Sequence, residues 1–346
     1  STYYTYTGID ENGVPTGLTP IDTSVGAGQP LSNNGEYGQG RHPRTAASTN
    51  LKSEYQDEYI LGFDKKLNDS WVYGAKATYR NLRNAIDDVA DNVSIIAKMN
   101  AMGIDPNSYD ATQVPGSILI NPGSTSYFNI PKLAGGYYTV QMDWKNDFHF
   151  NTTMKRKYYG LDLYLEHPFD GKWQGKIDYT YARNRGNTEG QVRSDFGQAD
   201  VSKTEDWDAW QLMHGAYGDL LNSRKHSLRL RGFYQFTPEW LASATLLVQS
   251  GTPKECLGYY GPDHDEDPVS YGPNYHWCAG TPAPPGSTGF TPWTRRLNLG
   301  LRYSPAFADH KLALSLDIYN VFNEQKELQV NPILDAGKDV VSNNYN

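Results

Sequence analysis

Two cysteines are the residues of this sequence with the clearest covalent chemistry. Cys256 and Cys278 lie in one segment that is rich in Gly, Pro and Tyr, which predicts a long loop. If this loop lies outside the cell, the oxidising surroundings favour a disulfide between them. Such a bond would restrict the unfolded loop by about 3 kcal/mol. Two free thiols are the alternative.

An acidic run lies between the two cysteines. Asp263, Asp265 and Asp267 alternate with His264 and Glu266. Carboxylate oxygens are the ligands that Ca²⁺ prefers, so a calcium site is one interpretation. The run lacks the glycine turn and the distal Glu of a calcium-binding loop. A solvated acidic loop tip is the other interpretation.

Aromatic side chains surround the acidic run and have two possible uses. They either form a stacking surface for a captured ligand, or they pack the loop onto its neighbours. The candidate substrate-contacting residues are Tyr259, Tyr260, Tyr271, Tyr275 and Trp277.

Catalytic motifs are scarce. The eight His residues are scattered, and neither a Gly-x-Ser-x-Gly elbow nor a phosphate-binding loop occurs. The 39 acidic residues make some carboxylate pairs expected by chance. We therefore expect no enzyme and no cofactor, apart from the possible Ca²⁺.

The composition is both aromatic and polar. The chain has 346 residues, 26 Tyr, 8 Trp and a formal charge of −8, with a mean hydropathy of −0.67. No apolar run approaches the ~18 residues of a membrane-spanning helix. The acidic balance disfavours nucleic-acid binding, and the aromatic content disfavours disorder. The 33 Gly and 20 Pro suggest many strands with long loops.

Alternation of apolar and polar residues predicts four pairs of strands. Short turns join the strands of each pair, whereas very long connections join the pairs. The predicted pairs are 55–63 with 71–79, 159–165 with 173–181, 228–236 with 240–248, and 297–303 with 312–318. Residues 2–7 are a candidate ninth strand. Two amphipathic helices are expected in the long connections, at 86–102 and at 203–221.

Alternation alone does not separate a soluble sandwich from a membrane barrel, but three features favour the barrel. Short turns alternate with long connections, and soluble domains rarely carry structureless loops beyond ~12–15 residues. Aromatic residues stand beside the turns and again eight residues farther along, about 20 Å away in a tilted strand. These predicted girdle residues are Trp71, Trp173, Trp240, Tyr79 and Tyr181.

The third feature is charge on the opposite face of the strands. Water inside a barrel tolerates these side chains, and lipid does not. The predicted lumen-facing residues are Lys76, Arg80, Asp162, Lys176, Asp178, Arg229, Arg231, Arg296, Arg302 and Asp317. Asp57 fits badly, because alternation places it on the lipid side. Either a bulge resets the register there, or the strand extends above the membrane.

Residues Arg296–Tyr303 and the run Asp317-Ile-Tyr-Asn320-Val-Phe-Asn323 resemble the last hairpin of TonB-dependent outer-membrane transporters. Further stretches resemble the Oar-like branch of that family. These are Ile60–Phe63, Gly74–Arg80, Ile86–Asp88, Asn187–Gly190, Asp195–Gln198, Arg224–Arg229 and Gln249–Pro253. The resemblance covers roughly residues 50–325.

The resemblance implies an all-β fold, an antiparallel transmembrane barrel of 22 strands in the bacterial outer membrane. Residues 1–346 would be its C-terminal portion, without the final strand and without the N-terminal plug domain. It implies a transporter that moves a large substrate, such as a peptide or protein, with TonB, the plug and outer-membrane lipid as partners. An outer-membrane adhesin or surface enzyme anchored by its barrel and a passive porin are the alternatives.

Overall fold

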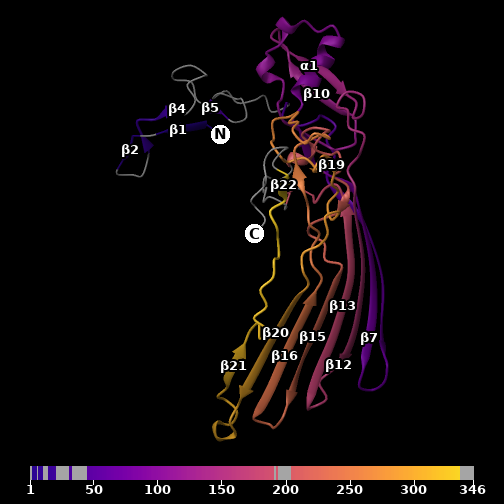
Figure 1. Ribbon diagram of the computed structural model, residues 1–346, viewed down its shortest axis with the longest axis vertical. Coiled ribbons are helices and arrows are strands. Elements are labelled where there is room, and N and C mark those ends of the chain that lie inside the picture. The colour runs from indigo at the N-terminus through magenta and orange to yellow at the C-terminus, as the bar shows by residue number, and fades with distance from the viewer. Residues whose placement is uncertain are drawn as a thin grey trace.

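A computed structural model describes residues 2–5, 7–10, 15–20, 31–32, 45–190, 192–193 and 204–335 of the chain. Figure 1 shows a large sheet of long strands at one end and a dense group of shorter elements at the other. The long strands of the sheet are β6 (Tyr55–Lys66), β7 (Val72–Asn84), β12 (Arg156–His167), β13 (Trp173–Gly186), β15 (His226–Gln235), β16 (Trp240–Gln249), β20 (Thr294–Tyr303) and β21 (Leu314–Ile318).

The sheet is antiparallel and follows the order of the chain. Its strands run β21-β20-β16-β15-β13-β12-β7-β6, and the short β14 (Gly218–Asp219) pairs with β13. Each predicted hairpin is present, and the pairs join edge to edge through β7 with β12, β13 with β15, and β16 with β20. Within the described part of the chain, β6 and β21 are open edges that do not pair with each other.

The register aligns the apolar positions of neighbouring strands on one face. Leu163 pairs with Ala75, and Leu246 pairs with both Leu230 and Leu297. Because side chains alternate between the two faces of a strand, this register produces one continuous apolar face and one polar face. The apolar face is uncovered, and Leu61 is 80% exposed.

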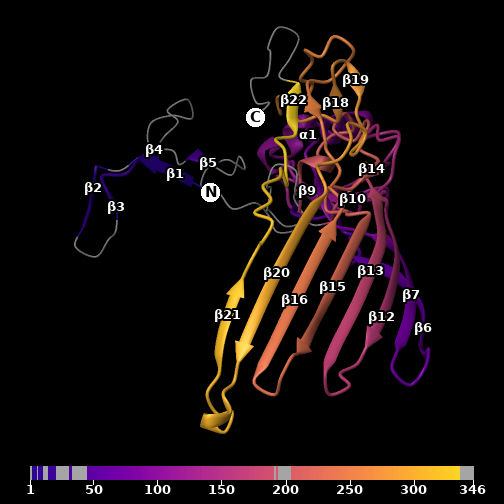
Figure 2. The same ribbon diagram turned by 60° about the horizontal axis from the view of Figure 1, so that its bottom comes forward.

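The connections divide by length as the sequence predicts. The short turns between paired strands lie at one end of the sheet, and the long connections gather at the other end (Figures 1 and 2). The short turn between β20 and β21 contains the 3-10 turn Ala306–Ala308. We call the described parts of residues 85–155, 187–225, 250–293 and 328–335 the cap.

The cap has regular structure of its own, in contrast to the structureless loops that the connection lengths alone suggest. Its helical elements are α1 (Asn92–Ala101) and the 3-10 turns Pro106–Ser108, Ala111–Gln113 and Glu205–Trp207. Its strands are β8 (Asp87–Val89), β9 (Ile118–Ile120), β10 (Ser126–Pro131), β11 (Tyr137–Met142), β17 (Leu257–Gly258), β18 (Trp277–Cys278), β19 (Thr281–Pro282) and β22 (Ile333–Asp335).

A hydrophobic core fills the cap. Phe128, Trp144, Phe150 and Trp207 belong to it, and the rings of Trp144 and Phe150 stack with centroids 4.1 Å apart. Trp207 comes from a connection more than fifty residues beyond Phe150, so two long connections share one core. No helix in the described ranges is long and apolar enough to cross a membrane.

Four predictions about local structure differ from the structure. Residues Thr2–Thr5 form β1, but β1 pairs with β4 (Thr19–Pro20) and β5 (Leu31–Ser32), while β2 (Gly8–Ile9) pairs with β3 (Pro15–Thr16). No strand of this N-terminal group joins the large sheet. The helix expected at 203–221 is a single 3-10 turn within the described residues 204–221, because Thr204 caps it and Gly215 at φ 95° breaks the pattern.

The other two errors concern boundaries. The helix expected at 86–102 begins only after Asp91, whose side chain accepts the amide of Ser94, and Asp87–Val89 is extended. The strand expected at 312–318 begins only at Leu314 and ends at Ile318, and Asn320 and Asn323 beyond it adopt positive φ angles of 51° and 46°. Asparagine tolerates this left-handed region better than most residues, so the Asn-rich ending is a turn.

Candidate functional site

The uncovered apolar face carries aromatic rings at both of its ends. Toward the cap, Tyr79 lies between Tyr59 and Tyr159, with ring centroids 6.2 and 5.2 Å away. At the turn end, Trp71 contacts Trp173 at 5.8 Å, and Trp240 stacks on Tyr303 at 4.4 Å. All five predicted girdle residues therefore lie on this face, and Tyr181 lines the same hollow as Tyr79 and Tyr159.

Asp57 lies beyond the row of tyrosines and is neutralised there. Its carboxylate accepts a hydrogen bond from Nε of Arg83 at 2.6 Å. The register shifts between Tyr55 and Gln56, so the strand also contains the irregularity that the sequence suggested. Since Asp57 lies on the cap side of Tyr59, its charge is outside the band that the aromatic rings define.

The opposite face carries a row of ion pairs that crosses from β6 to β15. Arg80 contacts Glu58 at 2.6 Å, and Lys76 contacts Asp162 at 3.2 Å. Lys176 contacts Glu166 at 3.0 Å and Asp178 at 3.8 Å, and Arg231 reaches Asp178 at 3.6 Å. The pairs are part-exposed, as expected of a face in contact with water.

The row of ion pairs ends on β15, at Arg231. Arg229, Arg296 and Arg302 lie on the same face, and none of them has an ion-pair partner among the described residues. Arg229 pairs in register with Leu247, which pairs with Arg296, so these two arginines occupy one row across three strands. Asp317 is opposite Gly300 on the edge strand β21. All ten predicted lumen-facing residues lie on the polar face.

The candidate substrate-contacting aromatics mostly pack against each other inside the cap. Tyr275 is completely buried and Trp277 is buried, and Tyr260 contacts both rings at 5.6 and 4.9 Å. Tyr271 donates a hydrogen bond from its hydroxyl to Asp208 at 2.6 Å. Tyr259 is half-buried. Of the two uses that the sequence left open, the geometry corresponds to packing of the loop on its neighbours.

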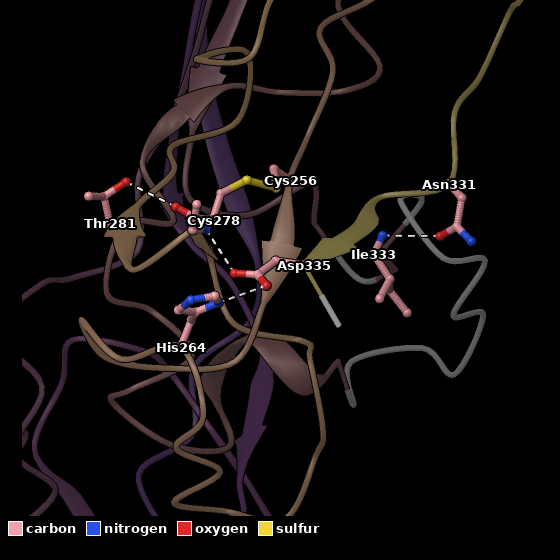
Figure 3. The surroundings of a disulfide bond; sticks show 8 residues. Cys256, His264, Cys278, Thr281, Asn331, Ile333 and Asp335 are labelled. Carbon is pink, nitrogen blue, oxygen red and sulfur yellow. Dashed lines mark hydrogen bonds and ion pairs between the residues drawn. A yellow bond between two sulfur atoms is a disulfide. The ribbon is translucent and has the colours of Figure 1, made fainter. Parts of the chain in front are cut away.

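A disulfide joins Cys256 and Cys278, with Cα atoms 5.7 Å apart (Figure 3). The bridged segment holds the last described residues of the chain. Strand β22 pairs in parallel with β17, and the Asp335 carboxylate accepts the amide of Ala279 at 2.8 Å and contacts His264 at 3.1 Å. The disulfide therefore fixes the loop that contains Cys256 and Cys278, and this loop in turn holds the segment that ends at Asp335.

The acidic run does not form a cluster. Asp267 accepts hydrogen bonds from the amides of Tyr271 and Gly272 and from the hydroxyl of Tyr275, so its carboxylate shapes the loop. Asp263 and Asp265 do not gather around it, and no group of three or more His, Cys, Asp or Glu residues in the described ranges is arranged to hold a metal ion.

Four other aspartates form a buried acidic centre of the cap. Asp87 accepts the amide and hydroxyl of Thr204 at 2.8 Å each, Asp88 accepts the hydroxyl of Ser117, Asp206 contacts Arg193 at 3.0 Å, and Asp208 accepts from Tyr271. Burial, reinforced by the neighbouring acids, raises the pKa of Asp87 and of Asp208 to about 8.

Reasoning from the sequence missed this acidic centre. The adjacent pairs of acids at 87–88 and 205–206 are visible in the sequence. Nothing in the sequence indicates, however, that Asp87 and Thr204, which are 117 positions apart, are in contact. Part of the quoted family resemblance, Asp195–Gln198, lies outside the described residues.

No protein-family model matches the chain, and no curated protein matches its sequence. Among solved structures, the chain is similar to the outer membrane transporter YddB from Escherichia coli, with a TM-score of 0.47 and 14% identity over 82% of this chain and 31% of that one. It is also similar to the ferripyoverdine receptor of the outer membrane of Pseudomonas aeruginosa, with a TM-score of 0.40 and 13% identity. That match covers 83% of this chain and 26% of the receptor. The chain thus spans about a third or less of these proteins.

Proposed function

We propose that this chain is part of the wall and the external cap of an outer-membrane transporter. One observation carries the proposal. A single antiparallel sheet has an uncovered apolar face edged by aromatic rings and an opposite face lined by ion pairs. A soluble protein would cover such an apolar face, whereas a bilayer needs it exposed.

The proposal extends to the mechanism that the family resemblance implies. A plug segment closes the lumen of the complete barrel, and TonB supplies the force that opens it. The ordered cap supports a receptor role, because two long connections held by one core make a fixed surface above the lumen. The cargo in this proposal is large, such as a peptide or protein, as in the Oar-like branch.

Planar-bilayer conductance of the intact protein separates a plugged transporter from a passive porin. We expect almost no conductance in buffer and a rise when mild urea unfolds the plug. A large steady conductance without urea would support the porin. Site-directed cross-linking to TonB in cells then tests the energy-coupled mechanism, and a protein that never cross-links to TonB would refute it.

An anchored surface protein, such as an adhesin, is the second candidate. The core of the cap supports it as well, because a cap with its own core needs the barrel only as an anchor. The two candidates differ in where function resides. If the protein is a transporter, a variant whose cap core is disrupted should still cross-link to TonB and should lose only its selection of cargo. If it is an adhesin, neither the native protein nor the variant should cross-link to TonB.

A further inference from the structure

The arginines of the polar face continue into a groove at the cap end of the sheet. The groove lies beside β16, β20 and residues 320–328, and its cavity volume is about 390 Å³. Its walls include Leu247, Gln249, Thr294 and Arg296. These four positions share the polar face, so the groove is lined mainly from the side of the predicted lumen. Arg295, which also lines it, pairs with Val248 of the apolar face, so the groove lies at the cap end of the strands.

Positive charge dominates the lining of this groove. Arg224, Arg295, Arg296 and Lys326 line it, against the single carboxylate of Glu324. Glu324 is already engaged, because it accepts from the amide and guanidinium of Arg295. Lys326 also interacts with Glu324. The groove therefore keeps two cationic groups, Arg224 and Arg296, that no carboxylate of its own lining neutralises, and Arg229 adds a third in the same row as Arg296.

One cationic group and one wall of the groove are held in place without a ligand. Arg224 donates to the carbonyl of Ser250 at 2.6 Å, so its guanidinium is fixed at the end of β16. The segment beyond β21 is fixed by the amide of Val321, which donates to the carbonyl of Leu297 at 2.8 Å, and by the amide of Asn320, which donates to Asn298 at 3.0 Å. Arg296 itself is exposed.

We propose that this groove binds a carboxylate-rich, acidic peptide portion of the cargo. Guanidinium groups match the planar geometry of carboxylates and bind them with paired hydrogen bonds. Strands lie ~4.8 Å apart, so Arg229 and Arg296 are separated by roughly 10 Å along the row. An extended peptide with several acidic side chains spans such a distance better than one compact anion. This inference rests on the proposed transport function and names the chemistry of the cargo.

The test uses the intact protein in detergent and fluorescein-labelled hexaglutamate as the probe, with binding followed by fluorescence anisotropy. The variant is Arg296→Gln with Lys326→Gln. Its matched control is Arg302→Gln, which lies on the same strand and the same face but six residues away, roughly 20 Å from the groove. Retention of the heat-dependent gel shift of folded barrels shows that each variant is folded.

We expect the double variant to weaken hexaglutamate binding at least tenfold, while the control changes it less than twofold. Raising the salt concentration should weaken the native interaction, and hexalysine should not bind. Tripolyphosphate is used as a competitor, to test whether the groove prefers phosphate. If it displaces the probe at a lower concentration than unlabelled hexaglutamate, the groove is a phosphate site and the proposal fails.

Equal binding by the native protein and the double variant would also overturn the proposal. So would an absence of binding by the intact protein, which is the result expected if acidic side chains elsewhere in the complete barrel already fill the groove. Binding in detergent needs neither TonB nor an energised membrane. A failure of the transport function therefore leaves this measurement unaffected, and the two hypotheses fail separately.

Discussion

The sheet and the cap place their apolar side chains in opposite ways. Among the described residues, the buried hydrophobic side chains come almost entirely from the cap, and Leu82 is the one that lies in a long strand. The long strands instead expose Leu61, Phe63 and Leu316. The cap is thus stabilised by its own core, whereas the sheet depends on lipid and on neighbouring strands.

The two regions also treat charge in opposite ways. On the sheet, Lys76 and Asp162 form a pair whose side chains are 54% and 38% exposed. In the cap, Arg193 and Asp206 form a pair whose side chains are 4% and 11% exposed. Water solvates the first pair, while the second must be satisfied within the protein. Changes in the two regions should therefore differ in kind and in size.

The largest expected effect is the removal of the ring at the centre of the cap. Trp207 is fully buried and lies 5.7 Å from Trp144 and 5.8 Å from Phe150. We expect Trp207→Ala to destabilise the cap by about 3–5 kcal/mol, as for other large core truncations. Near-ultraviolet circular dichroism and limited proteolysis report on the cap, and the heat-dependent gel shift reports on the sheet.

Trp207→Phe is the control, because it keeps an aromatic ring in the core and should destabilise the cap much less. The comparison predicts that Trp207→Ala loosens the cap while the sheet stays folded. Simultaneous loss of both signals would show that the two regions unfold as one unit.

The next effect is an arginine in the lipid-facing band. Ala244 and Thr245 are neighbours near the middle of β16 and point to opposite faces, with Ala244 paired to Leu299 and Thr245 paired to Arg231. We expect Ala244→Arg to cost roughly 2–4 kcal/mol of folding free energy in a bilayer, and Thr245→Arg less than about 1 kcal/mol. Urea titration of refolding into lipid vesicles measures both. Similar costs for the two variants would refute the assignment of the faces.

The extent to which the sequence predicted each region follows from this contrast. The sheet was predictable because period-2 alternation, the turn tryptophans and the charged positions are all local patterns, and each hairpin repeats them. The core of the cap was not predictable, because Phe128, Trp144 and Trp207 come from separate connections and share no period. The aromatic residues near Cys278 were found, but only the packing shows that Tyr275 is buried.

A third effect concerns pH and belongs to the cap alone. Burial raises the pKa of Asp87 from 3.8 to about 8. Below the pKa of the unfolded state, both the folded and the unfolded state hold the proton, and the stability of the cap does not depend on this group. As the pH rises toward 8, the unfolded chain releases a proton that the folded cap retains, so stability falls by at most about 1.4 kcal/mol per pH unit for each such group.

We therefore expect the cap to become more sensitive to protease between pH 5 and pH 8, with the sheet unchanged. Asp88 and Asp206 surround Asp87 and should strengthen the trend. Asp87→Asn should flatten the profile, because the amide carries no charge at either pH. A profile of the same steepness in this variant would assign the effect to another group.

The smallest effect is expected from the ion pairs of the polar face. Arg80 and Glu58 are 2.6 Å apart, but their side chains are 45% and 36% exposed. Because water screens such a pair, Arg80→Gln should change the folding free energy by less than about 1 kcal/mol, and high salt should reduce the difference further. Vesicle refolding in urea, at low and high salt, measures both quantities. A cost above about 2 kcal/mol would mean that this face is dry, and the contrast between a wetted sheet face and a self-contained cap would then fail.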